Sequence, residues 1–538
     1  MTADEENGDD SAPFWAYLSA SHRDRRDWVM PLEANYSEEN YLGMNASDYG
    51  GGTPVIDIWN REHGVAVGHL EMVPKLVSLP VESDQNGNVT VGVVKEEERV
   101  IEPGESVTTL RTFVSLHRGD YFNALEMYRE FMVRQGVDFD PYPDSAYEPI
   151  WCAWGYGRDF TMDQIYGALP KARELGFKWA VLDDGWQTAE GDWFLHPDKY
   201  PDGVEDMKKF TDTIREAGLR PKLWWAPMAV DPGTELLEEH PEYALVNEDG
   251  EYQKISWWDA WYICLVYEPA REHTRELVRI IMEDFGYDGL KIDGQHLNAA
   301  PPCYNPDHNH ARPEESVEAV PDYFKMIYDT ALEIVPDAVV EICPCGTAYS
   351  FFTMPYMNQP VSSDPLSSWQ IRLKGKTMKA LMGRDVPYYG DHVELSDNGS
   401  DFASTIGIGG VPGTKFTWPV GSGGRPRNDL TPEREASMKS WLDIYQEHML
   451  PKGDYRGELY DIGYDRPEAH AVAKEGKIYY AFYAESFSGE LELRGLEEGK
   501  DYEVRDYVND AAMGTVSGPT GNLQAEFEGS LLIEAVAE

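Results

Sequence analysis

The short run Gly289–Asp293 ends by presenting a lysine and an aspartate. Side chains alternate along a strand, so Lys291 and Asp293 share one face while the apolar residues between them share the other. At the C-terminal end of a strand in a closed parallel barrel, that charged face points into the mouth where such barrels do chemistry. A cation two residues away lowers the pKa of a carboxylate and keeps it ionised, which makes Asp293 the candidate nucleophile. The alternative is an ion pair that seals one end of the barrel.

Two further strand ends carry carboxylates. Asp183-Asp184 follows an apolar run, and two adjacent carboxylates can grip vicinal hydroxyls, although Asp-Gly is also a common turn pair. Asp364 precedes Pro365 and a helical pattern; it could cap that helix, but Ser367 or Ser368 is better placed.

Two carboxyl groups that face each other across one pocket are what a retaining glycosidase needs. At a separation of about 5–5.5 Å, one attacks the sugar and the other protonates the leaving oxygen and later deprotonates water. We assign these roles to Asp293 and Asp364. Covalent catalysis of this kind needs no cofactor, and none is predicted.

Tryptophans surround these carboxylates in the sequence. Trp151 and Trp154 belong to the first strand end, and Trp186 follows the aspartate pair. Aromatic faces stack on the C–H faces of a sugar while carboxylates bind its hydroxyls, so this composition suits a carbohydrate pocket. The same tryptophans could equally be core residues.

Cysteines and histidines raise the question of a metal. Cys303, His308 and His310 follow the Asp293 strand, and Cys343 and Cys345 end the next one. Thiolate and imidazole ligands suit zinc, yet these spacings match no familiar zinc pattern. We therefore predict no metal and interpret these residues as loop residues or thiols that line the substrate site.

The motifs Trp151-Cys-Ala-Trp154, Leu182-Asp-Asp-Gly-Trp-Gln187 and Lys291-Ile-Asp-Gly-Gln295 resemble glycoside hydrolase family 36, in the clan of the α-galactosidases. They are especially similar to its raffinose-synthase and alkaline α-galactosidase branch. The double-aspartate and Lys-x-Asp elements together are specific, whereas either alone is not.

The resemblance implies that Asp293 is the nucleophile, Asp364 the acid/base, and Asp183 and Asp184 the ligands of the O4 and O6 hydroxyls. It also implies that the same sugar subsite is lined by Lys291, Trp154, Trp224 and Cys343.

The chain departs from the family near C2 of the sugar. The family often places an arginine just before the acid/base aspartate, where this chain has Pro360-Val361. The family's small glycine-rich stretch after the fifth strand reads Cys343-Pro-Cys-Gly346 in this chain. The identity of the C2 substituent is therefore open.

Strands alternating with amphipathic helices must position these residues. Eight apolar segments fit, and a (β/α)8 barrel is the predicted fold, with Tyr262–Val266 or the run before it as an insertion. The predicted strands are 150–155, 179–183, 222–226, 289–293, 339–343, 359–363, 386–390 and 414–418. The predicted helices between them are 162–175, 204–217, 271–285, 317–334, 369–382 and 434–449.

Short alternating segments on either side of the barrel predict a β-sandwich-like N-terminal domain and a small C-terminal β-sandwich. The predicted boundaries are 1–10 for a disordered acidic leader, 11–147 for the N-terminal domain, 148–452 for the barrel and 453–538 for the C-terminal domain.

Charge limits the partners. The 538 residues include 96 Asp and Glu but only 46 Lys and Arg, which gives a formal net charge of −50. This field disfavours nucleic acid and anionic membranes and accepts a neutral small molecule or oligosaccharide. Because carboxylates are scattered along the whole chain, we also expect an acidic surface suited to high salt.

Five cysteines in so long a chain fit a reducing compartment. Without a signal-like N-terminus or a long apolar run, the sequence predicts a cytoplasmic protein outside the membrane. Homo-oligomerisation stays open.

The motifs together predict a retaining exo-α-galactosidase. A galactosyltransferase of the raffinose-synthase type, an α-N-acetylgalactosaminidase and an inactive carbohydrate-binding homologue are the alternatives.

Overall fold

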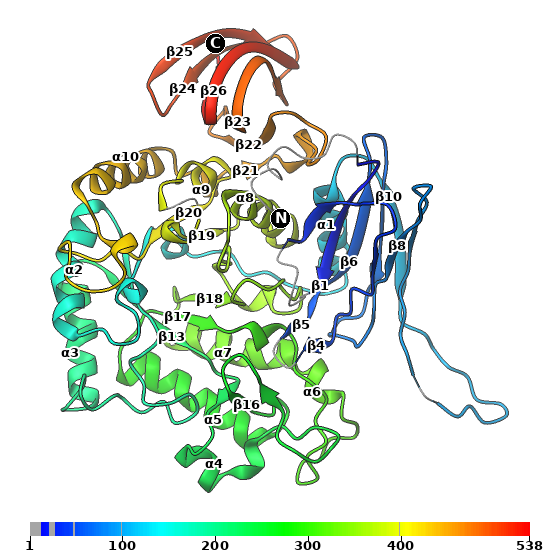
Figure 1. Ribbon diagram of the computed structural model, residues 1–538, viewed down its shortest axis with the longest axis vertical. Coiled ribbons are helices and arrows are strands. Elements are labelled where there is room, and N and C mark those ends of the chain that lie inside the picture. Colours follow the sequence, from blue (N-terminus) through cyan, green and yellow to red (C-terminus); the bar gives the residue numbers. More distant parts are fainter. Residues whose placement is uncertain (1–11, 21–26, 47–48, 98, 397–398) are drawn as a thin grey trace.

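The computed structural model describes residues 12–20, 27–46, 49–97, 99–396 and 399–538 in three parts (Figure 1). A β-rich N-terminal part lies on the right in Figure 1, a barrel in the centre and left, and a β-sheet with the C-terminus at the top. The predicted acidic leader lies outside the described residues. Within the described ranges, no helix combines the length and the apolar character needed to cross a bilayer.

The central part is a ring of parallel strands. Seven strands pair in the order β18-β17-β13-β12-β11-β20-β19. Their bounds are β11 Ile150–Cys152, β12 Trp179–Leu182, β13 Arg220–Trp225, β17 Gly289–Asp293, β18 Val339–Cys343, β19 Tyr389–His392 and β20 Val411–Thr414.

The eighth position of the ring is the segment 358–362, which closes the gap between β18 and β19. Val361 forms a parallel bridge to Tyr389, and the Asn358 amide donates to the Val340 carbonyl at 3.1 Å. Two features keep this segment from forming a regular strand. Pro360 has no N–H to donate to a neighbouring strand. The Val340 amide donates to the side-chain oxygen of Asn358 at 2.8 Å and not to a backbone carbonyl. The predicted (β/α)8 barrel is confirmed, with its sixth strand reduced to a bridge and its last two strands displaced by about three residues from the predicted ranges.

Helices cover the barrel much as the apolar periodicity predicts. They are α2 Met162–Leu175, α3 Val204–Glu216, α5 Glu268–Arg279 continued by a π-helical turn Ile280–Asp284, α6 Glu315–Glu318, α7 Val320–Ile334, α8 Ser368–Met382, α9 Ala403–Gly407 and α10 Pro432–His448. Helix α2 starts with a capping box: the Thr161 side chain accepts from the Gln164 amide, and the Gln164 side chain binds the Thr161 amide.

An insertion interrupts the barrel between β13 and α5, as predicted. It contains helix α4 (Glu235–Glu239) and a three-stranded sheet of β14 (Ala229–Val230), β16 (Ala260–Tyr262) and β15 (Lys254–Ile255).

The main sheet of the N-terminal part has the order β10-β7-β6-β1-β2, with β1 Trp15–Ala20, β2 Val29–Pro31, β6 Gly52–Trp59, β7 Gly64–His69 and β10 Thr112–His117. Its central strands β1, β6 and β7 are buried on both faces, whereas the edge strand β10 is exposed or half-buried along its length. On β1, Trp15 and Tyr17 pack into the core shared with the barrel, whereas Ala16 and Leu18 pack into a second core.

Smaller sheets and one helix complete this part, which has the predicted sandwich-like character. They are β3 Ser37–Glu38 with β8 Val81–Ser83 and β9 Val89–Val91, β4 Met44–Ala46 with β5 Tyr49–Gly50, and helix α1 Tyr121–Arg134.

The C-terminal part is built on two long strands. β23 (Lys477–Arg494) and β26 (Thr520–Ala537) pair antiparallel along their length, with a bulge between Ala484 and Ser486. β21 (Asp454–Tyr455), β22 (Glu468–Lys474), β24 (Asp501–Asp506) and β25 (Ala511–Ser517) complete a sheet around a separate apolar core.

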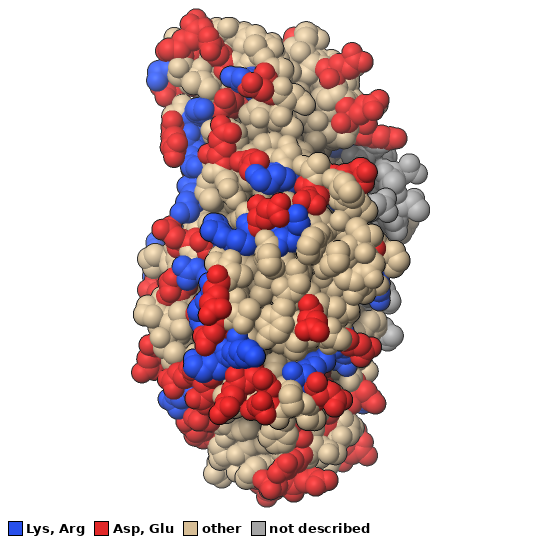
Figure 2. Space-filling model, turned by 90° about the vertical axis from the view of Figure 1, so that its left-hand side faces the viewer, with Lys and Arg blue, Asp and Glu red and all other residues tan. Residues whose placement is uncertain are grey.

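Acidic side chains are spread over the face of the molecule drawn in Figure 2 rather than gathered in one patch. Figure 2 shows Asp and Glu from top to bottom of one face, with Lys and Arg in smaller groups between them.

Helix α8 joins the three parts, and all of its residues are buried. Its Arg372 forms two hydrogen bonds of 2.8 Å with Glu468 on β22. One turn further, Lys376 donates to Asp120, the N-cap of α1, at 2.6 Å and to the carbonyl of Tyr460 at 2.9 Å. Arg372 and Lys376 are therefore matched by acceptors from both flanking parts.

Glu468→Leu is expected to lower the free energy of unfolding by about 3–5 kcal/mol, because it leaves the Arg372 charge buried without its partner. The double variant Arg372→Met/Glu468→Leu removes both charges and should recover most of that loss in urea unfolding. A loss equal to or greater than that of the single variant would contradict the electrostatic cause.

The same pair has a pH signature. Burial raises the pKa of Glu468, but the Arg372 charge and the His470 hydrogen bond outweigh it and hold the pKa at about 2, below the ordinary 4.5. The stabilisation is complete above pH 4.5 and is lost as the pH falls toward 2. The single variant should lack this part of the acid destabilisation.

Candidate active site

A cavity of about 500 Å³ opens where the barrel strands end. Asp293 and Cys343 are the last residues of β17 and β18, and Asp183 directly follows β12. The lining residues are Trp154, Arg158, Asp183, Asp184, Glu190, Trp224, Asp231, Trp257, Trp258, Lys291, Asp293, Gln295, Cys343, Cys345, Asp364, Asp391, His392 and Lys415.

Eight of the ten sequence-predicted site residues line this cavity, and two do not. Trp151 and Trp186 are fully buried behind it. The indole N–H of Trp151 donates to the Phe416 carbonyl, and that of Trp186 donates to the Trp224 carbonyl, each at 3.0 Å. Their prediction as sugar contacts was wrong, because both indoles are satisfied by backbone carbonyls in the core.

Asp293 is held by two side chains from neighbouring strands. The Trp224 indole donates to its Oδ2 at 2.7 Å and the Cys345 thiol to its Oδ1 at 2.8 Å. Both oxygens are therefore oriented, and the carboxylate lies in the cavity with its position set by β13 and by the turn after β18.

The pKa of Asp293 is about 6, which corrects the expectation that Lys291 keeps it low. Burial raises the pKa most and the nearby charge of Asp364 raises it further, while the Lys291 charge lowers it only in part. Lys291 donates instead to Asp183 Oδ2 at 2.7 Å. Desolvation of Asp293 exceeds the attraction of a lysine already engaged by another carboxylate.

If Asp293 is the nucleophile, as predicted, it must be ionised to attack, and the acid limb of kcat/KM is expected near pH 6 because a lower pH protonates it. Lys291→Met removes a charge that lowers this pKa, so the residual activity should show its acid limb at higher pH. Lys415→Met, also in the cavity but not a cause of the Asp293 shift, is the matched control and should leave the limb in place. A limb that stays near pH 6 in Lys291→Met would remove the assignment.

The aspartate pair is fixed from several sides. Asp183 accepts from Lys291, from the Cys152 thiol at 3.1 Å and from the Asp184 amide at 3.0 Å. Asp184 accepts from Gln187 at 2.8 Å and from the guanidinium of Arg158. Each carboxylate keeps a fixed orientation, which is what two hydroxyl ligands require.

A second acidic pair lies beside Asp184. The Glu190 amide donates to Asp231 Oδ2 at 3.0 Å. Burial and then the neighbouring Asp231 raise the pKa of Glu190 to about 7. Neither residue was predicted, because neither stands at the end of a predicted barrel strand: Glu190 lies in the loop after β12, and Asp231 directly follows β14 of the insertion.

Stacked tryptophans form one wall of the cavity. The rings of Trp224 and Trp258 are 5.8 Å apart and nearly parallel, with an interplanar angle of 13°. The Trp258 indole donates to Gln295 at 2.8 Å, which links the insertion to the turn after β17. Sequence reasoning missed Trp257 and Trp258 because the insertion was not recognised as part of the mouth.

Asp364 lies in a tight turn after the bridge at Val361. Ser363 and Asp364 both have positive φ, 58° and 46°, and the Asp364 amide donates to Asp391 at 2.7 Å. Burial and the charge of Asp364 raise the pKa of Asp391 to about 7. As predicted, the cap of α8 is Ser367, whose side chain accepts from the Gln370 amide.

Lys374 of α8 binds the backbone of this turn. Its ammonium donates to the carbonyls of Ser362 and Ser363 at 2.9 and 3.0 Å, and the side chain is buried. Non-glycine residues at positive φ are retained where the surroundings impose them, and Lys374 supplies part of that constraint on Asp364.

Lys374→Met is expected to lower kcat by about 10²-fold with a small change in KM, because a displaced Asp364 misaligns proton transfer while the sugar ligands stay. Lys379→Met in the same buried helix is the control: burial lowers the Lys379 pKa to about 7, and its contact is the carbonyl of Arg384. Steady-state kinetics measures kcat and KM of both variants, and circular dichroism checks that both are folded. Equal kcat in the two variants would contradict the role of Lys374 in positioning Asp364.

The cysteine and histidine residues considered as metal ligands separate into two groups. Cys343 and Cys345 lie beside Asp293 in the cavity, whereas Cys303, His308 and His310 are not among its lining residues and gather around Cys264.

Comparison with known proteins agrees with this geometry. The sequence profile of the family described as Melibiase matches residues 126–399, about half of the chain. A Flavonifractor plautii protein named A type blood alpha-D-galactosamine galactosaminidase is 33% identical over 548 residues, covering 98% of this chain and 48% of its own length. A probable alpha-galactosidase C of Aspergillus flavus is 24% identical over 258 residues, covering 45% of this chain and 33% of its own. The chain thus spans about half or less of the length of these relatives.

Solved structures share the fold. The raffinose complex of the GH36 alpha-galactosidase AgaA of Geobacillus stearothermophilus superposes with a TM-score of 0.72 at 18% identity, over 98% of this chain and 75% of that one. An alpha-galactosidase of Lactobacillus brevis gives a TM-score of 0.67 at 15% identity, over 98% and 74%. The resemblance to glycoside hydrolase family 36 is confirmed: with half of its length matched and its carboxylates gathered at the mouth of a barrel, this chain belongs to the melibiase family.

Proposed function

We propose that this chain is a retaining exo-α-glycosidase that removes terminal α-D-galactose by double displacement. One observation carries the proposal: Asp293 and Asp364 line the same cavity and lie close enough for the Asp364 charge to raise the Asp293 pKa. The family and its galactosidase members support the choice of sugar.

In the first displacement, Asp293 attacks C1 of the sugar while Asp364 donates its proton to the leaving oxygen. The C1–O bond breaks and a sugar–Asp293 ester forms with inverted configuration. In the second, Asp364 takes a proton from water, the water oxygen attacks C1, and the ester breaks to regenerate Asp293. Two inversions release the α-anomer.

The fixed polar groups opposite these carboxyls suit the remaining hydroxyls of the ring. Asp183 and Asp184 accept from hydroxyls, and Lys291 donates to one. Trp154 and the stack of Trp224 on Trp258 offer apolar faces to the C–H groups. A terminal sugar is the unit that we propose for this set of groups.

A second candidate is an α-D-galactosaminide with a free 2-amino group. Seven carboxylates line the cavity against three cations, Arg158, Lys291 and Lys415, so an ammonium substituent would be attracted. Asp391, adjacent to Asp364 and therefore near C1, is the carboxylate best placed for a C2 ammonium. The name of the Flavonifractor plautii relative points to the same sugar.

A panel of aryl α-galactoside, α-galactosaminide and α-N-acetylgalactosaminide tests the proposal. We expect turnover of the first, and higher kcat/KM for the second if the acidic pocket selects an amine. Asp391→Asn should then reduce the galactosaminide rate more than the galactoside rate. A binding-only protein would bind galactose without any turnover, which would overturn the proposal.

Two further readouts use the same assay. Proton NMR of the first-formed sugar should show the α-anomer, and first-formed β-galactose would mean inversion. With sucrose present, release of oligosaccharide instead of free galactose would identify a transferase. Running the panel in dilute and in molar salt also tests the expected adaptation of the acidic surface to salt, which full activity without salt would contradict.

A further inference from the structure

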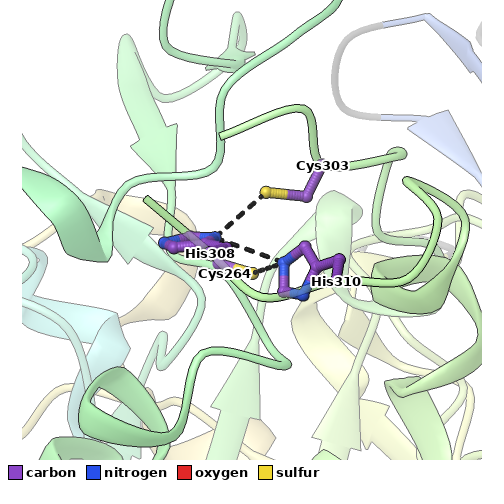
Figure 3. Close-up of side chains that lie close together, drawn as sticks. All are labelled: Cys264, Cys303, His308 and His310. Atoms are coloured by element: carbon purple, nitrogen blue, oxygen red, sulfur yellow. Dashed lines mark hydrogen bonds between the residues drawn. The ribbon is translucent and has the colours of Figure 1, made fainter. Parts of the chain in front are cut away.

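Two cysteines and two histidines lie close together between the insertion and the loop after β17 (Figure 3), and none of them lines the cavity. Cys264 follows β16 of the insertion, and Cys303, His308 and His310 belong to the long loop that leads from the turn 295–298 to α6. One ligand atom from each of the four side chains lies within 4.8 Å of all the others.

We propose that Cys264, Cys303, His308 and His310 bind one Zn²⁺ in a closed, structural site. Cys264 Sγ is 3.3 Å from His310 Nε2, Cys303 Sγ is 3.4 Å from His308 Nδ1, and the two nitrogens are 3.2 Å apart. A tetrahedral shell with Zn–S of about 2.3 Å and Zn–N of about 2.0–2.1 Å has N–N edges of about 3.3 Å and S–N edges of about 3.5 Å. The two S–N distances and the N–N distance match such a shell, and the remaining pairs of ligand atoms lie within 4.8 Å of each other.

The tautomer of His308 directs a lone pair into the group. Its Nε2 lies 2.6 Å from the carbonyl oxygen of Glu242, which can only accept, so Nε2 carries the hydrogen and donates it. In the neutral imidazole Nδ1 is then unprotonated, and it faces Cys303 and His310. A carbonyl that fixes the second nitrogen in this way is the usual partner of a metal-bound histidine.

Hydrogen bonds alone satisfy this arrangement poorly. The single lone pair of His308 Nδ1 faces both the Cys303 sulfur and His310 Nε2, while His310 Nε2 also faces the Cys264 sulfur. If both thiols donate to the imidazoles, two imidazole lone pairs face each other at 3.2 Å; if His310 donates to His308 instead, the Cys264 sulfur remains only a weak acceptor beside His310. One Zn²⁺ with both thiols deprotonated uses all four lone pairs and is neutralised by the two thiolates.

Contacts outside the four ligand atoms also shape the loop. The Cys303 amide donates to the Pro313 carbonyl at 2.9 Å, and the Asn305 side chain donates to the Ala244 carbonyl at 3.0 Å. Tyr267 stacks on His308 with ring centroids 4.3 Å apart. Cys264, Cys303 and His308 are all buried. Four protein ligands leave no open position for water, so the site is structural and not catalytic.

The metal would tie the insertion to the loop after β17. The same insertion carries Trp257 and Trp258 to the cavity, and Trp258 binds Gln295 at the start of that loop. Loss of the metal should therefore loosen the aromatic wall and weaken sugar binding, while the strand-end carboxylates stay in place.

The first test is the zinc content of the 538-residue chain, measured by elemental mass spectrometry after exhaustive dialysis against metal-free buffer. We expect one zinc per chain in the wild type and a loss to background in Cys303→Ser and His308→Ala. Cys343→Ser is the matched control, since it removes a ligand from the other group, Asp293 with Cys343 and Cys345, and should retain zinc. Zinc retained in Cys303→Ser and lost in Cys343→Ser would overturn the proposal.

The second test uses the wild-type protein, so a folding defect in a variant cannot affect its result. X-ray absorption of the zinc-loaded wild type should give two sulfur ligands at about 2.3 Å and two nitrogen ligands at about 2.0–2.1 Å. Cobalt substitution should give the intense visible bands of a tetrahedral, thiolate-bound ion. An oxygen-rich shell, or no zinc after equilibration with a stoichiometric amount, would overturn the site regardless of activity.

Discussion

Asp293→Asn is expected to lower kcat on an aryl α-galactoside by at least about 10⁴-fold, because the amide oxygen cannot form the sugar ester. The replacement keeps the size of the side chain and can still accept from Trp224, so the pocket should keep its shape. Turnover measured over hours against a no-enzyme blank gives the residual rate. Near-normal rates in this variant would remove the mechanism.

The control for that loss is binding. Calorimetry should show that Asp293→Asn still binds galactose, since Asp183, Asp184 and Lys291 remain. In Asp293→Gly, added azide can occupy the vacated space and attack C1, and we expect β-galactosyl azide. Formation of the α-azide would place the nucleophile elsewhere.

Asp364→Ala is expected to lower kcat by about 10²–10⁴-fold on substrates with a poor leaving group, because no group then protonates the departing oxygen. An oligosaccharide such as raffinose has such a leaving group, whereas a dinitrophenyl galactoside leaves without a proton. The ratio of the two rates in the variant measures the acid contribution directly. A uniform loss on both substrates would contradict the assignment.

The dinitrophenyl substrate also reports on the second step. With Asp364 absent, no base activates water, and the sugar–Asp293 ester should accumulate as a burst of dinitrophenol. Azide needs no base, so it should restore turnover and give α-galactosyl azide. Absence of both the burst and the azide effect would place the acid/base at another residue.

The sequence by itself determined the barrel and most of its mouth. Alternation placed Lys291 and Asp293 on one face of β17, and parallel strands of a barrel end at one edge, so polar strand ends had to converge. Asp183, Asp184, Asp364, Trp154 and Cys343 follow from this rule, because strand period and barrel topology are local properties of the chain.

Strand alternation and barrel topology do not predict which side chains interact with each other. Lys291 pairs with Asp183 from a neighbouring part of the ring, and burial sets the Asp293 pKa near 6. Trp151 and Trp186 look like their lining neighbours in sequence but turn into the core. The direction of one indole depends on which carbonyl lies within its reach, and only the assembled fold supplies that carbonyl.

Only the tertiary structure brought distant segments together. Helix α8 has the lysines and arginine of a solvent-facing helix, yet it is buried because two other parts of the chain pack on it with Glu468 and Asp120. Cys264 stands almost forty residues before Cys303 in the chain, and no spacing pattern links them. Charge matching and ligand geometry are relations in space between residues far apart in sequence, so local periodicity carries no record of them.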